Sequence, residues 1–402
     1  MRVIKTLLVL MLAGLSPALA AELTLVQTVP DETVYGSTLT ARPVDTWVEM
    51  MDGASATLDI EQFYIAHKPG EPLEAVLDAV KRAAARGVKV RIIVDKVMMG
   101  ESSGPLKELG ALENVEGRVI NYRKAFGGVQ HAKFFIVDGR EVFVGSQNFD
   151  WRALRHIHEL GLRIKSERAA RTFSVIFEED WAIAGGAAPT ERFRKPGFKP
   201  VSRKRPEAAS FLGEKVSYHL AFSPVKSRPS SFGAEIKELL RMIKKAKTSF
   251  RAQVMSYAIK DYDGTLWFEL DRALRAAGRR GVEVRLIFAD WTMGKKDDKY
   301  IKDLAEAKNI SVRISSLPRH SGGFVPFARV EHCKYAVADG KVSYVSTSNW
   351  GKSYFYGSRD AAVFVKGSSM GRALGDIFET AWGGPYVEPV EQEKKYKAVK
   401  RN

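Results

Sequence analysis

A pattern of four chemically distinct residues occurs twice in this 402-residue chain, with the same spacing each time. The first copy begins HAKFFIVDG at His131, and the second begins HCKYAVADG at His332, 201 residues later. In each copy a lysine follows two positions after the histidine, an asparagine seventeen positions after it and an acid twenty-eight positions after it. These residues are Lys133, Asn148 and Glu159 in the first copy, and Lys334, Asn349 and Asp360 in the second. Repetition at this distance indicates a duplicated domain, because solenoid units run only about 20 to 50 residues.

The sequence before each copy supports the duplication. Apolar runs typical of strands flank a stretch of helical periodicity, which predicts a β-α-β unit in each half. The predicted strand, helix and strand cover 58–66, 72–85 and 87–95 in the first half, and 250–259, 266–277 and 281–290 in the second. The chain is therefore expected to be an α/β protein whose two similar halves pack together.

The first twenty residues predict export. Arg2 and Lys5 precede an apolar run, and Ala18-Leu19-Ala20 offers a small-x-small cleavage site. A single membrane anchor is the alternative, although the apolar run is short for a span. The single cysteine excludes a disulfide scaffold and fits a bacterial periplasmic or secreted protein. We predict a signal peptide at 1–20, a first domain at 21–184, a basic Gly/Pro linker at 185–209, a second domain at 210–386 and a basic tail at 387–402.

The charge balance favours a polyanionic partner. The 63 basic against 47 acidic residues give a formal net charge of +16, which suits nucleic acid or an anionic membrane surface. A solvated basic surface with no such partner is the alternative reading.

The repeated residues suit phosphoryl transfer. A neutral imidazole can attack phosphorus while a second, protonated imidazole gives its proton to the departing oxygen. The two lysines and two asparagines supply donors for the non-bridging oxygens. Glu159 and Asp360 can hold ring N–H groups and so fix each tautomer.

No metal or other cofactor is expected. A phosphohistidine can replace metal activation of water, and the sequence shows no convincing cluster of metal ligands. A zinc site from His131 and His332 is the competing reading, but the paired lysines would repel a dication. Asp138 and Asp339 each begin an Asp-Gly pair, which predicts a hairpin turn and a structural role.

These motifs resemble the phospholipase D superfamily, whose hallmark is a twice-used H-x-K-x4-D motif followed by an asparagine and an acid. The resemblance implies two tandem domains, each a mixed β-sheet flanked by helices, with one active site at their pseudo-twofold interface. It implies that His131 is the nucleophile and His332 the general acid, with the lysines and asparagines holding phosphate. Ser346, where glycine usually stands, and Asp360, where glutamate is more usual, depart from the family pattern.

Within that superfamily, GSQNFDWRAL (145–154), HELGL (158–162), PFARVEHCKY (326–335) and STSNW (346–350) resemble the lysosomal single-strand 5′-exonucleases and the poxvirus envelope homologues. The resemblance covers about residues 34 to 382. Ser146, Thr347, Trp350 and His320 are assigned to substrate binding, Trp350 because aromatic rings stack bases and His320 because it lies in a glycine-containing loop. Cys333 is expected to be packed core.

The predicted activity is a metal-independent phosphodiesterase that works through a phosphohistidine. Single-stranded nucleic acid is the favoured substrate, and phospholipid head groups are the alternative, with hydrolysis or transfer to an alcohol. A non-catalytic polyanion-binding protein is the remaining hypothesis. Both motifs lie in one chain, which predicts a monomer, and the basic surface suggests peripheral contact with an anionic membrane.

Overall fold

The computed structural model describes residues 21–189, 197–294 and 298–402, so the predicted signal peptide at 1–20 lies outside the described residues. The elements of the first half are β1 (Ala21–Thr28), α1 (Pro43–Asp52), β2 (Thr57–Gln62), β3 (Ile65–Ala66), α2 (Leu73–Ala85), β4 (Lys89–Asp95), α3 (Met99–Gly110), β5 (Val115–Ile120), α4 (Tyr122–Phe126), β6 (Phe134–Val137), β7 (Glu141–Gly145), β8 (Phe149–Asp150), β9 (Glu159–Lys165) and α5 (Glu167–Ala184). The two expected β-α-β units are present, as β2-α2-β4 here and as β13-α7-β14 in the second half.

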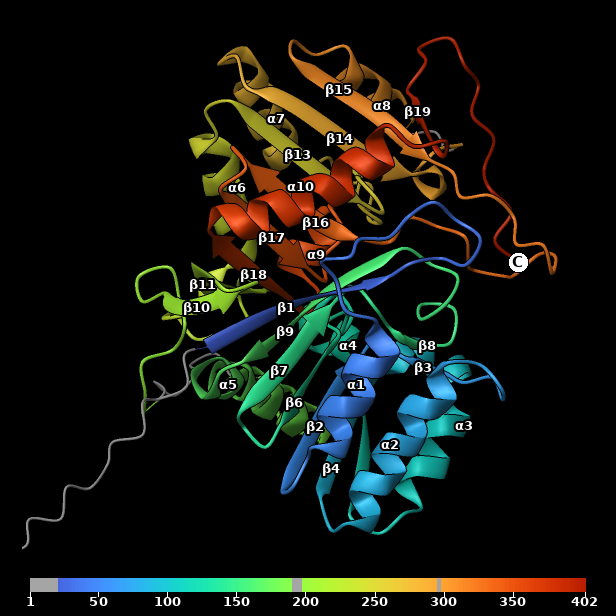
Figure 1. Ribbon diagram of the computed structural model, residues 1–402, viewed down its shortest axis with the longest axis vertical. Helices are drawn as coiled ribbons and strands as arrows, with labels where there is room; N and C mark the ends of the chain where they lie inside the picture. The colour runs from blue at the N-terminus through green and yellow to red at the C-terminus, as the bar shows by residue number, and fades with distance from the viewer. Residues whose placement is uncertain (1–20, 190–196, 295–297) are drawn as a thin grey trace, which may run out of the picture.

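The second half repeats this order. Its elements are β10 (Glu207–Phe211), β11 (Glu214–Ser223), β12 (Gly233–Ala234), α6 (Glu235–Lys245), β13 (Ser249–Val254), α7 (Glu269–Arg279), β14 (Glu283–Ala289), α8 (Asp298–Ala305), β15 (Ile310–Ser315), β16 (Lys334–Ala338), β17 (Val342–Ser346), α9 (Lys352–Tyr356), β18 (Asp360–Lys366), α10 (Ser368–Trp382) and β19 (Val387–Pro389). Short 3-10 turns follow β4 and β14. The halves lie one above the other along the long axis of the molecule (Figure 1).

Each half contains a mixed sheet with the same strand order. The order is β5-β4-β2-β6-β7-β9-β1 in the first half and β15-β14-β13-β16-β17-β18-β11 in the second. The three strands at the far end of each sheet are parallel, as β-α-β connections require, and the hairpin strands are antiparallel. The α/β class with two mixed, helix-flanked sheets is therefore confirmed.

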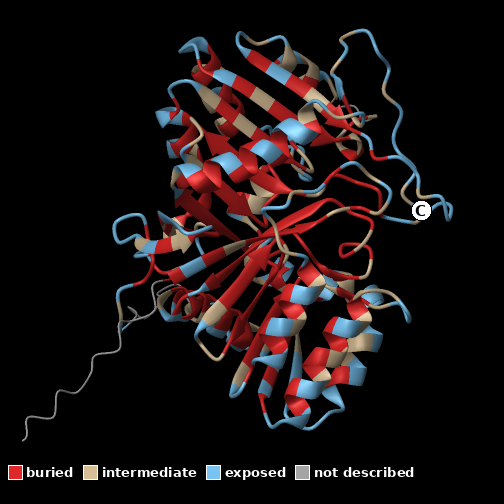
Figure 2. Cartoon of the chain, in the orientation of Figure 1, coloured by how far each residue is buried: buried red, intermediate tan, exposed pale blue. Residues whose placement is uncertain are grey.

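Helices cover both faces of each sheet. Helices α1 and α2 pack with the outer face of the first sheet, and α6 and α7 pack with the outer face of the second. Helices α5 and α10 join the inner faces of both sheets in one shared core. Figure 2 shows that the strands are buried where the two halves meet. This continuous apolar core fixes one half against the other.

The linker and the tail are more ordered than their composition indicates. The end of the predicted linker forms β10, which pairs with β1 on one side and β11 on the other and so links the two sheets. The predicted tail begins with β19, which pairs with β15, and it ends with the Arg401 guanidinium 4.6 Å from the Trp291 ring centroid. Both segments have backbone or ring partners that a count of basic residues does not reveal. Among the described residues, no helix is long and apolar enough to cross a membrane.

Candidate active site

The segments that carry the two histidines cross between the halves. His131 N–H donates to the Arg359 carbonyl (2.9 Å), and Arg359 N–H donates back to the Val129 carbonyl (2.9 Å). The same exchange occurs on the other side, where His332 N–H donates to the His158 carbonyl (2.9 Å). Arg359 and His158 each precede the acid of their own half. Each histidine is therefore placed next to the acid of the opposite half.

The side chains form the same crossed pairs. His131 Nδ1 lies 2.8 Å from Asp360 Oδ1, and His332 Nδ1 lies 2.9 and 2.8 Å from the two Glu159 oxygens. Both acids are fully buried, and burial raises the pKa of Glu159 well above its usual range and that of Asp360 to about 7. Because Nδ1 is engaged in both rings, Nε2 is the nitrogen left for chemistry.

Both histidines face one pocket of about 410 Å³. Its lining residues are Phe63, Tyr64, Val97, Arg123, Gly127, Gly128, Val129, His131, Asn148, Met255, Tyr262, His332, Asn349, Ser353, Tyr354 and Ser358. The structure thus brings the two predicted histidines and the two predicted asparagines together at the interface of the halves. A pocket with two imidazoles and two amides can hold one phosphodiester group between a nucleophile and an acid.

Each of the two lysines contacts the backbone of the histidine in its own motif. Lys133 and Lys334 are buried, and each Nζ donates to the backbone carbonyl of its own histidine, Lys334 at 2.5 Å. Burial lowers the pKa of Lys133 well below its usual range and that of Lys334 to about 8, because a site with little water disfavours the charged ammonium. The Lys334 ammonium lowers the pKa of Lys133 further. An incoming phosphate would neutralise this charge, which is how the site favours an anionic substrate.

Burial also sets the charge of the imidazoles. It lowers the pKa of His131 and His332 well below the usual value, and the neighbouring lysines lower it further. The free site therefore holds neutral rings, the form needed for nucleophilic attack. Binding of an anionic phosphodiester opposes the lysine charges and favours the protonated form that a general acid needs.

The Asp-Gly pairs form the expected turns. Asp138 and Gly139 have φ of 52° and 62°, and Asp339 and Gly340 have 53° and 60°, as a two-residue type I′ hairpin requires. Asp138 accepts hydrogen bonds from the backbone N–H groups of residues 55–57, and Asp339 from those of 247–249. Partial burial raises the pKa of both carboxyls, but these hydrogen bonds lower it more, so both pKa values lie below the usual value. The turn geometry and these hydrogen bonds support a structural role for Asp138 and Asp339.

Neither histidine lies in a strand together with its lysine, although a spacing of two residues would place both side chains on one face of a strand. Strand β6 begins at Phe134 and β16 at Lys334, so both histidines precede the strands. The preceding segments pair with the opposite half instead of continuing the hairpin. The imidazole and the ammonium are neighbours because Lys Nζ returns to the histidine carbonyl.

The four residues assigned to substrate binding lie elsewhere. Ser146 and Thr347 are fully buried behind the acids: Ser146 Oγ accepts from Leu160 N–H (2.9 Å), and Thr347 Oγ1 donates to Asp360 Oδ1 (2.6 Å). Trp350 is fully buried in the core of the second half, and His320 is outside the pocket lining, beside His156. None of the four lines the pocket between the halves, because proximity to the motif in sequence does not bring a side chain there. Their assignment to substrate binding stays a prediction.

Sequence reasoning missed most of the remaining pocket wall. Phe63 lies 5.2 Å from the His131 ring centroid and 5.2 Å from Lys133 Nζ, and Tyr354 lies 5.0 Å from the His131 ring. Phe63 follows β2, and Met255 occupies the corresponding place after β13. The signal available in the sequence is that both residues follow the first parallel strand of a β-α-β unit, at the carboxyl edge where ligands bind.

One cluster in the described part of the chain has the composition of a metal site. His158, Glu331 and Cys333 place their ligand atoms within 4.8 Å of one another. His158 Nδ1 is 2.7 Å from Glu331 Oε2 and its Nε2 is 2.9 Å from the Gln27 amide, so these groups are already engaged. Cys333 is buried, as expected for packed core. The cluster lies outside the pocket lining and fits an interface ion pair.

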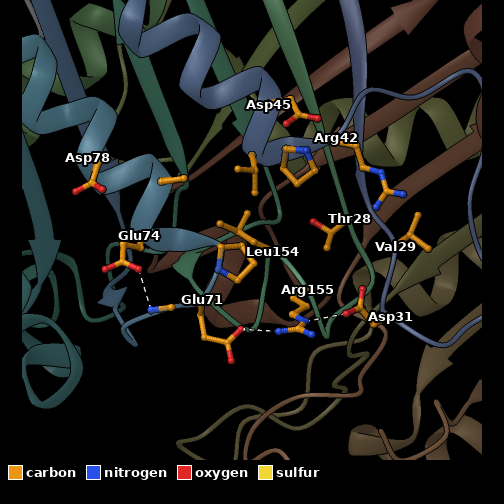
Figure 3. A pocket seen from close by; sticks show the side chains of 15 residues that line it. Thr28, Val29, Asp31, Arg42, Asp45, Glu71, Glu74, Asp78, Leu154 and Arg155 are labelled. Atoms are coloured by element: carbon orange, nitrogen blue, oxygen red, sulfur yellow. Dashed lines mark hydrogen bonds and ion pairs between the residues drawn. The ribbon is translucent and has the colours of Figure 1, made fainter. Parts of the chain in front are cut away.

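A larger cavity of about 720 Å³ lies over the ends of α1 and α2 (Figure 3). Its wall includes Asp31, Asp45, Glu71, Glu74 and Asp78, and Arg155 bridges Asp31 and Glu71. Carboxylates repel a polyanion, so this cavity does not suit a phosphodiester substrate. The smaller pocket between the halves is the candidate active site.

Two crossed His–acid pairs with buried lysines define a phosphodiesterase of the two-histidine class. Residues 47–181 and 239–382 match the family described as "Cardiolipin synthase, PLD-like domain". The chain belongs to this phospholipase D-like family, and it is a phosphodiesterase rather than a non-catalytic binding protein.

Two relatives and one solved structure illustrate the similarity. The chain is 29% identical over 396 residues to the 5'-3' exonuclease PLD3 of Rattus norvegicus, covering 91% of this chain and 80% of that protein. It is 29% identical over 367 residues to Phospholipase D Z of Dictyostelium discoideum, covering 86% of each. The crystal structure of phosphatidylserine synthase from Haemophilus influenzae superposes with a TM-score of 0.59 at 12% identity, covering 88% of this chain and 85% of that one, and so supports the fold.

Proposed function

We propose that this protein is an exported, monomeric phosphodiesterase that cleaves single-stranded nucleic acid through a phosphohistidine on His131. The assignment of single-stranded nucleic acid as substrate rests on two residues that line the pocket, Tyr262 and Arg123. Tyr262 is 90% exposed. An exposed ring and a guanidinium fit a base and its neighbouring phosphate. The net charge of +16 and the exonuclease name of PLD3 support the same substrate.

The reaction proceeds in two displacements. His131 Nε2 attacks phosphorus, the bond to the leaving oxygen breaks, and His332 gives that oxygen its proton. Water then attacks the same phosphorus, His332 takes a proton from the water, and the P–N bond breaks. Asp360 stabilises the His131 ring as it gains charge, and the lysines and asparagines bind the non-bridging oxygens. These residues carry the reaction without a resident metal.

Phospholipid is the second candidate substrate. Val97 lines the same pocket and is 48% exposed, which gives the mouth an apolar side. The name of Phospholipase D Z and the family description point the same way. Peripheral contact with an anionic membrane would then accompany catalysis.

One panel of substrates separates the two. The protein is incubated in EDTA with a 5′-hydroxyl single-stranded oligonucleotide and, separately, with phosphatidylglycerol and cardiolipin vesicles. We expect nucleotide release from the first and no phosphatidic acid from the second. Phosphatidic acid without nucleotide release would transfer the assignment to phospholipid, and loss of all activity in EDTA would contradict the metal-free mechanism. Size-exclusion chromatography with light scattering checks the monomer.

Replacing Tyr262 by alanine tests the stacking surface. Base–aromatic stacking contributes about 1–3 kcal/mol, so we expect Tyr262→Ala to raise KM for the oligonucleotide by about tenfold. Tyr262→Phe keeps the ring and should keep the wild-type KM. An unchanged KM for the alanine variant would show that Tyr262 does not hold a base.

A further inference from the structure

A buried carboxyl group with no basic partner among the described residues lies near the acid that holds His131. Glu235, the first residue of α6, is fully buried. Its oxygens accept hydrogen bonds from four hydroxyl groups and from no cation in the described structure. The donors are Ser223 Oγ (2.7 Å), Tyr344 Oη (2.8 Å), Ser346 Oγ (2.5 Å) and Ser348 Oγ (2.8 Å). Burying a carboxyl group without a cationic partner costs free energy, so packing alone does not explain why Glu235 is there.

The segment from Ser346 to Ser348 connects this group to the catalytic acid. Ser348 Oγ donates to Glu235 Oε2 (2.8 Å), and the adjacent Thr347 Oγ1 donates to Asp360 Oδ1 (2.6 Å). Asp360 Oδ2 has no hydrogen-bond partner in the described structure, although Ser348 helps to lower the pKa of Asp360. Asp360 in turn holds His131 Nδ1 at 2.8 Å. Adjacent residues of one segment therefore hold both Glu235 and the acid that binds His131.

The first half lacks this arrangement. At the places corresponding to Ser346 and Ser348 it has Gly145 and Gln147, and α1 begins with Pro43 where α6 begins with Glu235. A Cβ on Gly145 would meet the Gly161 Cα at 2.6 Å, so no serine fits there. The two departures of the second motif, Ser346 and Asp360, are thus both part of the Glu235 cluster. The acid behind His131 has a carboxyl neighbour that is bonded only to hydroxyl groups, whereas Glu331, the carboxyl near Glu159, is bonded to His158 (2.7 Å) and to the Gln253 amide (2.5 Å). This difference distinguishes the two histidines.

We propose that Glu235 is a positioning residue that shares one proton with Asp360, the carboxyl held by the same Ser346–Ser348 segment, and thereby sets the charge of the group that orients His131. Two buried carboxyls that interact do not both ionise readily, so the pair holds only one negative charge over the pH range in which two independent acids would both be ionised. Burial, and then the neighbouring Asp360, raises the pKa of Glu235 to about 7, the same value as for Asp360. The inference rests on the phosphodiesterase activity and is independent of which diester is the natural substrate.

Other charged and titratable groups also face this pair. They are His131 and Lys133 from the first half, and Lys334 and Tyr344 from the second. The lysines favour ionisation of Asp360 and act in both the wild type and the variants below. A change on replacing Glu235 therefore reports the carboxyl pair.

The test is the pH dependence of kcat/KM with bis(p-nitrophenyl) phosphate. Glu235→Gln keeps the size and hydrogen-bonding capacity of the side chain but removes its charge. We expect the pKa of Asp360 to fall, which moves the acidic limb of the profile down by about one pH unit. Ser348→Ala removes a hydroxyl that stabilises the carboxylates and should move the limb to higher pH. Opposite shifts are not the result of a general loss of packing.

Glu238→Gln is the matched control. Glu238 lies one turn along the same helix and pairs with Arg203 and Arg241 instead of the active site. The acidic limb of the pH profile of Glu238→Gln should coincide with that of the wild type. The proposal would be overturned if Glu235→Gln lowered kcat/KM at every pH without shifting the acidic limb of the profile. It would also be overturned if neither Glu235→Gln nor Ser348→Ala shifted that limb. If Glu235→Gln does not fold, the shift in Ser348→Ala decides.

Discussion

Replacing His131 by alanine should reduce kcat/KM by about 10⁴-fold or more, which is the scale seen when a catalytic nucleophile is removed. The reason is that no other group in the described pocket can form the covalent intermediate: the remaining imidazole, His332, is held by Glu159 for proton transfer. The measurement is steady-state kinetics on the oligonucleotide and on bis(p-nitrophenyl) phosphate. The loss should be similar for both substrates, because it affects the chemical step.

His320→Ala supplies the control for the same substitution outside the pocket. His320 contacts His156 and Glu32 and does not line the active site. Its activity should stay within about twofold of the wild type, since surface substitutions usually change little. Full activity in His131→Ala would refute the mechanism, and a large loss in His320→Ala would support the substrate-binding role predicted for His320.

Replacing Arg359 by alanine should lower the free energy of unfolding by about 3–5 kcal/mol, because it leaves a buried carboxylate unpaired. The Arg359 guanidinium is fully buried and makes two hydrogen bonds to Asp180 of the first half (2.6 and 2.8 Å). It also binds the carbonyls of Ser223 (3.0 Å) and Ser227 (2.5 Å) in the second half. The residue therefore clamps the two halves beside the catalytic acid, and guanidinium-induced unfolding measures its effect.

Arg372→Ala is the matched control in the same half. Arg372 pairs with Glu214, and both side chains are more than half exposed, so its loss should cost at most about 1 kcal/mol. Activity should also fall in Arg359→Ala, because the Arg359 carbonyl accepts the His131 N–H and the next residue is Asp360. Equal stability of the two variants would show that the buried clamp contributes no more than a surface pair.

The repeated motif was enough to predict which residues meet at the candidate active site, and to predict the two turns. Spacing alone identified His131 and His332 with their lysines, asparagines and acids, because residue types that must converge on one phosphate recur in register. The Asp-Gly pairs were equally informative, since few residues adopt positive φ at both positions of a tight turn. Local rules of this kind do not depend on the rest of the fold.

The contacts between the halves could not be predicted in the same way. Each histidine pairs with the acid of the other half, and spacing within one half cannot show which acid it meets. The same holds for β10 and β19, whose sequences are short and whose pairing depends on a neighbouring strand. Trp350 lies near the motif in sequence but turns into the core. Glu235 is 97 residues from the second histidine, so only the fold shows that it is part of this cluster.

The most direct test of the mechanism is to identify the covalent intermediate. His332→Ala is mixed with the p-nitrophenyl ester of thymidine 5′-phosphate, whose good leaving group needs no general acid, and the digest is analysed by mass spectrometry at alkaline pH. Without His332 to activate water, the nucleotidyl group should accumulate on His131. An adduct on another residue, or full product release with no adduct, would contradict the assignment of His131 as the nucleophile.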